Sequence, residues 1–329
     1  MKKLLSMLAI AAMFMTVSCK KDNPNNDDPQ DDPQEETKEV KVAEDALVAY
    51  FPLDDATEKV GNLTLDSQGS GTDANFVAGR RGKCYTGTPG SYLRFNLPAN
   101  SPLKDLKAMS VSMWIKHKEI DFSCAPTPMV FQITRSDDRC WGNFAMGCDR
   151  TDKGAGFLTW KVQFQSQVEN KDESTGEVLY VPGNIWKTSN ISRTDETTGV
   201  TTWDWANIFP VDRWLHIIWC YDNKTSQFHC YVNGMDVTPV DEEKGINYVD
   251  CTFGEENKPF GDLKFLNAEQ VMIGNWDVKY TSAAGWGWGD NWIGDFDNGM
   301  VDEIRVFNRS LTATEAKALY DAEVNAMDD

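Results

Sequence analysis

The chain has 329 residues and a formal net charge of −19, from 51 acidic and 32 basic side chains. This acidic balance disfavours binding to nucleic acid or to an anionic membrane surface, because both need clustered Lys and Arg. Residues 20–45 hold ten acids and four lysines, a net −6, so the remainder of the chain is acidic as well. The composition therefore favours neutral polyhydroxyl ligands or divalent cations as partners.

The N-terminus has the layout of a secretory signal. Lys2 and Lys3 precede an apolar run from Leu4 to Val17, as in a cleaved export signal. The run is shorter than the ~20 residues of a membrane-spanning helix. The following residues, Thr16-Val17-Ser18-Cys19, resemble the lipobox of bacterial lipoproteins, with Val at one position where Leu is commoner. That resemblance implies a signal peptide over 1–18, removed before a lipid-bearing Cys19; an ordinary cleaved signal is the alternative.

Residues 19–45 are predicted to form the lipidated cysteine and a disordered acidic tether. From Lys20 to Asp45 the chain has three prolines and no aromatic residue, so it cannot bury enough apolar surface to fold. Charge repulsion and proline favour an extended tether. A charged run after a lipidated cysteine resembles the surface-export tag of lipoproteins of the Bacteroides group. It implies lipid anchoring to the outer membrane, facing the cell exterior, with a periplasmic location as the alternative.

Residues 46–325 are predicted to form one domain of short strands separated by turns. The alternating segments, in chain order, are Leu47–Phe51, Ser91–Phe95, Ser110–Ile115, Gly154–Ser166, Gln270–Gly274 and Gly299–Phe307. A hairpin is predicted from Trp214–Tyr221 and Gln227–Val232, joined by the turn DNKTS and followed by Asn233-Gly234. Trp114, Trp214 and Trp219 are assigned to the core because they lie in strands.

The last segment is predicted to be helical. Thr312-Ala313-Thr314-Glu315 forms a capping box, and Ala316, Leu319 and Tyr320 then fall on one helical face. Many strands with one late helix predict an all-β, two-sheet antiparallel jelly-roll sandwich with a short C-terminal helix.

Four segments, in this order, resemble laminin G-like jelly rolls of the concanavalin A-like lectin/glucanase superfamily. They are residues 47–56 with 76–85, residues 109–118, the hairpin 212–237 and residues 299–320. The hairpin resembles the family's Trp-x-His…Tyr-Asp…Tyr-Val-Asn-Gly signature, and the last segment resembles its closing strand, turn and helix. Residues 119–213 and 238–269 are longer than the compact form of this domain needs, so no family site residue is carried onto them.

The eight cysteines, less Cys19, leave seven, and an odd number cannot pair completely within the chain. No Cys/His spacing typical of zinc is present. Cys220 and Cys230 lie on the two strands of the predicted hairpin, so a cross-strand disulfide is one interpretation. Buried free thiols are the favoured one.

Glycan hydrolysis is one candidate function, because part of the resembled superfamily hydrolyses glycans. Retaining glycosidases need two carboxylates about 5–5.5 Å apart, and the glucanases of this fold carry Glu-x-Asp-x-x-Glu or a close variant. Here Glu119-Ile120-Asp121 is followed by Cys124 where the second Glu should stand. Asp302 and Glu303 are adjacent, so a regular strand would point them to opposite faces. No catalytic residue is therefore assigned, and a glycoside hydrolase is the minority hypothesis.

Two loop segments favour carbohydrate binding. An exposed aromatic ring covers the flat face of a sugar, and Asp, Asn or Gln side chains bond its hydroxyls. One segment runs from Asn184 to Asn207, and the other runs from Trp276 to Trp292. The alternative is that these aromatics belong to the core. The predicted ligand-binding residues are Trp186, Trp203, Trp205, Trp286, Trp288 and Trp292.

The stretch GWGWGDNWIGDFDNG, residues 285–299, also offers oxygen ligands. Asp290, Asp295 and Asp297 are of the type that Ca²⁺ prefers, and several proteins of the resembled superfamily bind calcium. The favoured interpretation is turn formation, in which Asp and Asn bond their own backbone and Gly supplies positive φ.

The sequence thus predicts a lipid-anchored, non-catalytic, lectin-like protein of the cell surface. Its partners would be a glycan or polysaccharide, the membrane through the lipid anchor, and neighbouring glycan-uptake proteins. An adhesin or assembly module that binds protein is the alternative function.

Overall fold

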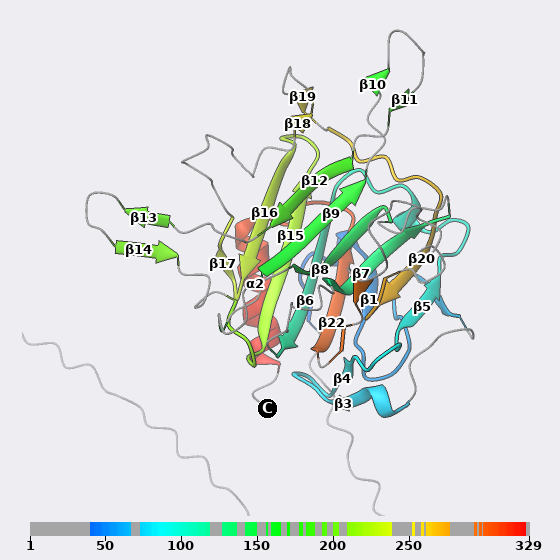
Figure 1. Cartoon of the computed structure of the whole chain (residues 1–329), viewed down its shortest axis with the longest axis vertical. Coiled ribbons are helices and arrows are strands. Elements are labelled where there is room, and N and C mark those ends of the chain that lie inside the picture. The colour runs from blue at the N-terminus through cyan, green and yellow to red at the C-terminus, as the bar shows by residue number, and fades with distance from the viewer. Residues whose placement is uncertain are drawn as a thin grey trace, which may run out of the picture. The chain divides into compact units, whose positions relative to one another are not determined.

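A computed structural model describes residues 40–66, 73–118, 127–136, 142–149, 156, 159–165, 170–171, 178–179, 182–187, 193–195, 200–203, 209–238, 252–253, 258–259, 261–276, 293–294, 296–297 and 299–326 (Figure 1). The chain divides into two units, Met1–Lys38 and Glu39–Asp329. The predicted signal peptide, Cys19 and most of the predicted tether lie outside the described residues. No helix among the described residues is long and apolar enough to span a membrane.

The second unit holds two main sheets, which we call sheet A and sheet B. Sheet A has the order β17-β16-β15-β6-β22-β4-β3, and β1 also pairs with β22. Its strands are β1 (Leu47–Phe51), β3 (Phe76–Ala78), β4 (Lys83–Thr86), β6 (Met109–His117), β15 (Leu215–Asp222), β16 (Gln227–Val232), β17 (Met235–Asp236) and β22 (Gly299–Phe307).

Sheet B has the order β12-β9-β8-β7-β20-β5-β2, and β21 joins β7 in parallel. Its strands are β2 (Thr64–Leu65), β5 (Leu93–Asn96), β7 (Thr127–Arg135), β8 (Phe144–Asp149), β9 (Thr159–Gln165), β12 (Pro182–Lys187), β20 (Ala268–Ile273) and β21 (Ile293–Gly294).

Short elements complete the described structure. Three two-stranded ladders pair β10 (Asn170–Lys171) with β11 (Val178–Leu179), β13 (Arg193–Asp195) with β14 (Val200–Trp203), and β18 (Thr252–Phe253) with β19 (Lys258–Pro259). The 3₁₀ helices are η1 (Glu44–Ala46), η2 (Asp73–Asn75) and η3 (Pro102–Lys104), and the α-helix is α2 (Ala313–Asn325).

The hydrophobic core lies between the two sheets, because alternate residues of each strand point inward. Val111 and Ile217 of sheet A share one buried cluster with Phe131 and Val162 of sheet B. The predicted all-β two-sheet sandwich with a C-terminal helix is confirmed. Trp114 and Trp219 are buried as predicted, but Trp214 is only partly buried, because it precedes β15.

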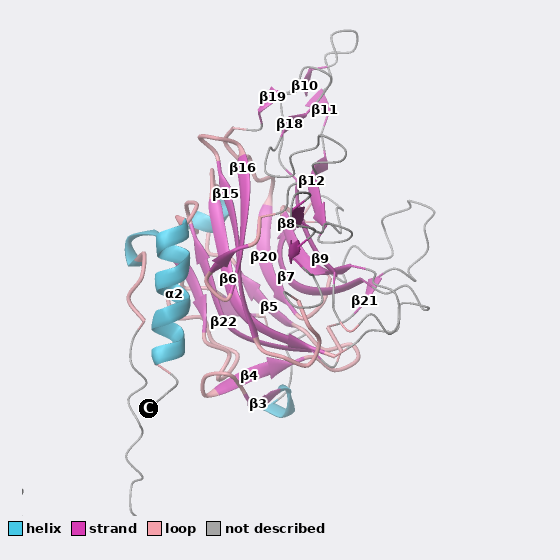
Figure 2. Ribbon diagram, turned by 90° about the vertical axis from the view of Figure 1, so that its left-hand side faces the viewer, coloured by secondary structure: helices cyan, strands magenta, loops and turns pink. Residues whose placement is uncertain are grey.

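Helix α2 covers the outer face of sheet A, as Figure 2 shows beside β22, β6 and β15. Ala316 and Leu319 pack into a second hydrophobic cluster with Ile218, Cys220 and Phe307 of the sheet. Helix α2 therefore closes the part of the outer face of sheet A that carries these residues.

The described cysteines are thiols. Cys84, Cys148, Cys220 and Cys230 are free and buried. Cys230 lies opposite Trp219, and Cys220 lies opposite His229, so the two thiols are one residue out of register and point to opposite faces. The alternative of a Cys220–Cys230 disulfide is therefore wrong, and the favoured interpretation of buried free thiols is confirmed for these four cysteines. Cys124, Cys140 and Cys251 lie outside the described residues.

The predicted capping box forms at the start of α2. Thr312 Oγ1 accepts from the Glu315 backbone N–H at 3.2 Å, and Glu315 Oε2 accepts from the Thr312 N–H at 2.9 Å. Arg309 makes a forked pair with Glu315 at 2.7 and 2.9 Å. The hydrogen bonds from Arg309 are the main reason why the pKa of Glu315 falls to about 2.

We expect Thr312→Ala to lower the free energy of unfolding by ~1 kcal/mol, because one backbone N–H at the helix start loses its acceptor. Urea denaturation followed by circular dichroism measures this loss. Thr314→Ala, in the same exposed first turn, is the matched control and should change stability by less than ~0.5 kcal/mol. Equal losses for the two variants would show that the capping box contributes nothing.

Candidate functional site

Several strand ends of sheet B lie together, and we call this end of the sandwich the rim. The start of β7, the end of β8, the start of β9 and the end of β12 meet there, next to β21. The register pairs that establish this, from β21 to β12, are Ile293–Thr127, Met129–Gly147, Asp149–Thr159 and Lys161–Lys187.

Sheet A reaches the same rim through the segment before β15. The Asp212 N–H donates to the carbonyl of His117, at the end of β6, at 2.8 Å. The Val211 N–H donates at 3.1 Å to the carbonyl of Gly156, which lies between β8 and β9. Strand ends of both sheets therefore face one surface of the molecule.

The two tryptophan-bearing segments are both attached at the rim. One leaves β12 after Lys187 and returns at Phe209, and the other leaves after Trp276 and returns at β21. Four strand spacings separate β21 from β12 across β7, β8 and β9. At ~4.8 Å for each spacing, the two attachment points lie ~19 Å apart. The attachment points of two segments that are distant in the sequence are thereby brought to one end of sheet B.

The structure places the predicted ligand-binding residues only in part. Trp186 lies in β12 opposite Val162, and Trp203 lies in β14 opposite Arg193. The side chains of these two residues are outside the described part of the chain, as are Trp205, Trp286, Trp288 and Trp292 altogether. Their roles in binding remain predictions.

The end of the glycine- and tryptophan-rich stretch is part of the core. Phe296 is fully buried, its N–H donates to the Gly274 carbonyl at 2.9 Å, and its ring centroid lies 4.9 Å from that of His117. A Cβ at Gly87 would lie 1.7 Å from the Phe296 carbonyl oxygen, and one at Gly299 would lie 2.2 Å from the Phe296 ring. Glycine is required at both positions because the chain passes so closely.

Trp276 is buried, although it begins the second predicted binding segment. It is 1% exposed and packs with Met129 and Ala145 in a small hydrophobic cluster. It is thus a core residue that holds the start of the segment. Together Trp276 and Phe296 fix both ends of residues 277–295.

The predicted calcium ligands stay largely untested. Asp290 and Asp295 are outside the described residues. Asp297 is partly buried and forms an isolated bridge with Gly87. Among the described residues, no three His, Cys, Asp or Glu side chains form a group that could hold a metal ion.

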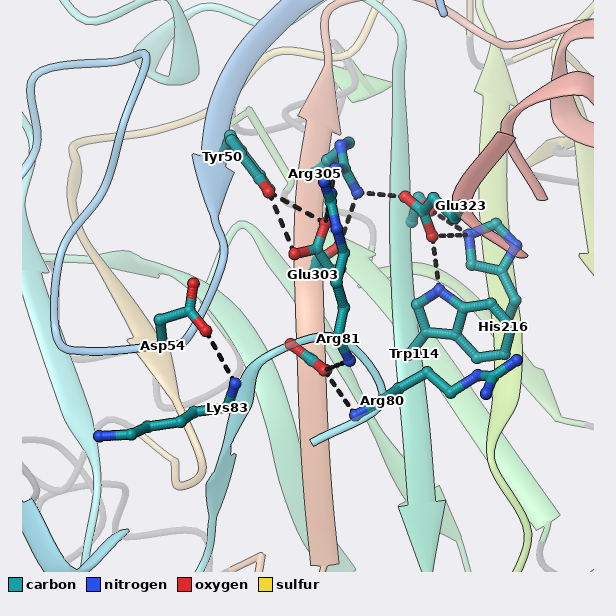
Figure 3. A network of polar contacts seen from close by, with 12 residues as sticks. Tyr50, Asp54, Arg80, Arg81, Lys83, Trp114, His216, Glu303, Arg305 and Glu323 are labelled. Carbon is teal, nitrogen blue, oxygen red and sulfur yellow. Dashed lines mark hydrogen bonds and ion pairs between the residues drawn. The ribbon is translucent and has the colours of Figure 1, made fainter. Parts of the chain in front are cut away.

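A second cluster of polar residues lies beneath α2 (Figure 3). At its centre is a β-bulge in β22, where the register with β6 shifts between Asp302 and Arg305. Glu303 has a φ of 54°, and the extra residue turns both acidic side chains away from the core. The expectation that Asp302 and Glu303 point to opposite faces is therefore wrong.

The two carboxylates both contact Arg81, Asp302 through the Arg81 backbone and Glu303 through its side chain, and otherwise have different partners. Asp302 Oδ2 accepts from the backbone N–H groups of Arg80 and Arg81, both at 2.9 Å. Glu303 Oε2 accepts from Arg305 at 2.6 Å and from the Arg81 side chain at 3.2 Å. Both acids are buried and engaged by the protein itself, so they do not form a pair of carboxylates facing each other across a cleft.

Helix α2 takes part in this cluster through Glu323, which is fully buried. Its carboxylate forms an ion pair with Arg305 and accepts from Trp114 Nε1 at 2.5 Å. It also lies 3.3 Å from His216 Nε2. The register of α2 is fixed by this contact, because a one-turn slip would bring Leu319, Tyr320 or Ala326 to Arg305 and leave the buried cation without that partner.

Ser112, His216 and Glu323 have the composition of a catalytic triad but not its geometry. Ser112 Oγ lies 2.8 Å from His216 Nε2, the same nitrogen that faces Glu323. A triad needs the acid on one ring nitrogen and the nucleophile on the other. All three residues are fully buried, so the constellation is structural.

Burial and charge determine the protonation of the cluster. Burial raises the pKa of Asp302 to about 8, against the two backbone N–H groups that lower it. Burial also raises the pKa of Glu303, more than Arg305 and Arg81 lower it. For Glu323, burial alone would raise the pKa, but Arg305 and His216 bring it below its usual value.

The outer face of sheet B carries a group of polar residues that no motif in the sequence indicated. Tyr92, Arg94 and Asn96 alternate with the buried Leu93, Phe95 and Leu97 along β5. Gln270 of β20 lies opposite Asn96. The alternation in SYLRFN predicts strand β5. It does not predict that Gln270 lies beside Asn96, because the two residues are far apart in the sequence.

Solved structures of similar fold were found, but no protein-family model matches the chain, and no curated protein matches it. The binding domain of Paraclostridial Mosquitocidal Protein 1 is 14% identical with a TM-score of 0.49, over 85% of this chain and 53% of that one. Domain 4 of a GH43 extracellular arabinanase from Geobacillus stearothermophilus, in complex with arabinotriose, is 18% identical with a TM-score of 0.44, over 83% and 98%.

A third similar structure is the ligand-binding domain of botulinum neurotoxin serotype D in complex with N-acetylneuraminic acid. It is 12% identical with a TM-score of 0.46, over 84% of this chain and 51% of that one. The chain thus spans about half the length of the two toxin domains.

We expect Glu323→Gln to lower the free energy of unfolding by roughly 3–5 kcal/mol, because Arg305 stays buried after losing one charged partner. The matched control is Asp321→Asn on the same helix, where an exposed ion pair with Lys317 is lost; it should cost less than ~0.5 kcal/mol. Urea denaturation of both variants tests this, and equal small losses would contradict the assigned role of Glu323.

We expect the stability of the wild type to fall relative to Asp302→Asn as pH rises from about 4 to about 8. The folded pKa of Asp302, about 8, lies above the ordinary value of 3.8, so the folded state holds the extra proton between these values. Stability is then lost as pH rises, at up to ~1.4 kcal/mol per pH unit.

Denaturation midpoints measured from pH 4 to pH 9 check this slope. Asp54→Asn is the control, because the exposed Asp54 likewise accepts a backbone N–H, that of Lys83. Parallel pH curves for the wild type and Asp302→Asn would contradict a raised pKa.

Proposed function

We propose that this protein binds carbohydrate without catalysing a reaction, through the tryptophan-bearing segments attached at the rim. The observation that carries the proposal is the convergence of those attachment points. Residues 188–208 and 277–292 are far apart in sequence, yet the residues that flank them lie at one rim: Lys187 and Val211 for the first segment, and Trp276 and Ile293 for the second. Binding residues are often held in this way on loops of a rigid sandwich.

The residue types in these segments suit a sugar. Tryptophan covers the apolar face of a sugar ring, and the neighbouring Asp and Asn side chains accept from and donate to its hydroxyls. The net charge of −19 favours a neutral glycan over an acidic one. The mechanism is aromatic stacking with hydrogen bonding, and it includes no covalent step.

Hydrolysis has less support. Asp302 and Glu303 are buried and bonded within the protein, and Glu119 and Asp121 lie outside the described residues. Protein binding by an adhesin or assembly module is the second candidate, and it would need no sugar-stacking tryptophans. The test below separates these functions.

The location and calcium dependence belong to the same proposal. A signal over 1–18 and a lipid on Cys19 would attach the domain to the outer membrane, facing the exterior, where it would capture glycan for neighbouring uptake proteins. The support is the sequence of residues 1–45. If Asp290, Asp295 and Asp297 hold Ca²⁺, the ion would order the segment that carries Trp286 and Trp288.

We expect the complete chain in detergent to bind neutral glycans on an array, and Trp286→Ala/Trp288→Ala to weaken binding at least ~10-fold through lost stacking. Met235→Ala is the control, since Met235 is exposed on the edge strand β17 of sheet A, and it should bind as the wild type does. The array is read with and without EDTA, and a loss with EDTA that Ca²⁺ restores supports the calcium site.

Two results of these measurements would contradict non-catalytic carbohydrate binding. No binding to any glycan, with unchanged tryptophan fluorescence, would contradict carbohydrate binding and favour the protein-binding function. Release of shorter sugars from a bound polysaccharide would establish hydrolysis instead.

A further inference from the structure

The part of the rim that belongs to sheet A carries two cations beside a tryptophan. We define the Lys116 patch as Arg80, Lys116 and Trp214, all three of which are partly buried. Arg80 lies in the turn between β3 and β4, Lys116 is next to the last residue of β6, and Trp214 immediately precedes β15. Three segments that are distant in the sequence therefore contribute one side chain each.

The pairing of β6 with β15 places Lys116 and Trp214 side by side. Its last pair joins Leu215 to Ile115, and a backbone hydrogen bond of 2.8 Å from the segment before β15 to the end of β6 keeps the two chains together beyond that pair. The next residues on the two chains are Trp214 and Lys116, so these two are neighbours. Leu215 and Ile115 face the core, and alternation therefore turns Trp214 and Lys116 to the outer surface.

Arg80 reaches the same place from the other side of β6. Its guanidinium carbon lies 4.9 Å from the centroid of the Trp114 ring, and Figure 3 shows its side chain extending past Trp114 toward His216. Lys116 follows Trp114 on the same face of β6, ~7 Å nearer the rim. The guanidinium of Arg80, the ammonium of Lys116 and the indole of Trp214 therefore surround one small area beside the residues that α2 covers.

The hydrogen-bond donors of the patch are not used by the protein. Among the described residues, the side chains of Lys116 and Trp214 form no hydrogen bond or ion pair, and the Arg80 guanidinium contacts only Trp114. The Arg80 Nε is buried, which leaves the two terminal nitrogens for a ligand. Asp212 is exposed two residues before Trp214, and an exposed arginine lies between them. Two cations placed side by side repel each other, so an anion between them is stabilising.

We propose that the Lys116 patch binds one carboxylate-bearing sugar residue of an otherwise neutral glycan. The planar guanidinium of Arg80 matches the two oxygens of a carboxylate, Lys116 adds a second positive charge, and the indole of Trp214 covers an apolar face of the sugar ring. A polyanion is disfavoured, because the net charge of −19 repels it. That the ligand is a glycan rests on the proposed function, since the patch adjoins the rim where residues 188–208 return.

Fluorine nuclear magnetic resonance of the complete chain in detergent, with 5-fluorotryptophan incorporated, tests the patch. Trp214→Phe identifies the signal of Trp214 by its loss. We expect sodium glucuronate to shift that signal, and glucose at the same concentration to leave it unchanged. Lys116→Ala should weaken glucuronate binding about 3- to 5-fold, as for the loss of an exposed ion pair. Arg80→Lys should weaken it similarly, because lysine cannot bind both carboxylate oxygens in one plane.

Lys83→Ala is the matched control. Lys83 is exposed on the same hairpin as Arg80, and its side chain points away from the patch in Figure 3, so this variant should bind glucuronate as the wild type does. Lys116→Ala removes no hydrogen bond or ion pair made within the described residues, so its denaturation midpoint in urea should equal that of the wild type. Weaker binding at an unchanged midpoint supports the patch.

Other outcomes would overturn the proposal. No shift of the Trp214 signal with glucuronate, galacturonate or N-acetylneuraminate would overturn the Lys116 patch and leave the rim function intact. An equal shift with sodium phosphate would overturn the sugar in favour of a general anion site, and a larger shift with adenosine monophosphate would overturn it in favour of a nucleotide. Tighter binding of hexagalacturonate than of galacturonate would overturn the single acidic residue. Glucuronate binding by a chain that binds no neutral glycan would contradict the proposed function and support the patch.

Discussion

The constraint on which the structure depends is that strand β22 is packed on both faces. Its apolar residues Val301, Ile304 and Val306 face the core between the sheets, and the bulge turns Asp302 and Glu303 with Arg305 to the opposite face. Because α2 covers that face, a charged side chain there must have a partner of opposite charge, or its burial destabilises the fold. Glu323 supplies the pair to Arg305, so the helix that follows β22 must return across sheet A.

This arrangement decides which surfaces are open to a ligand. The outer face of sheet A is occupied by α2 and its ion pairs (Figures 2 and 3). The start of β22 lies at the rim, where Phe296 is held between Gly87, Gly274 and Gly299. The strand therefore connects a closed face at its end with the candidate site at its start. On the outer face of sheet B, Met272, Gln132 and Ala145 are buried as well, so the rim is the candidate surface for binding.

Much of the fold could be predicted because its signals are local. The bounds of β1 and β22 agree with two of the predicted alternating segments, those of β16 agree with the second strand of the predicted hairpin, and the capping box of α2 agrees with the motif Thr312-Ala313-Thr314-Glu315. The bulge could not be predicted, since Glu303 adopts a positive φ where a glycine would be the usual signal. Glu323 also gave no signal, because an acid in a helix usually faces water.

For the candidate site, the sequence indicated residue types more than positions in the fold. Glycine density in residues 285–299 indicated a loop, yet Phe296 and the preceding Trp276 are core residues, because tertiary packing outweighs local propensity. The hydrogen bond from Gln270 to Asn96 could not be predicted, since these two residues meet only through pairing between strands that are distant in the sequence. To predict such neighbours one must know the register between the paired strands, and the sequence of a single strand does not contain it.

Hydrogen exchange of the complete chain, with and without a bound neutral oligosaccharide, tests the central claim most directly. The account predicts that the ligand slows exchange in residues 188–208 and 277–292 together, with no change in α2. Slowed exchange in α2 and β15 alone, or in neither rim segment, would contradict a ligand site at the rim.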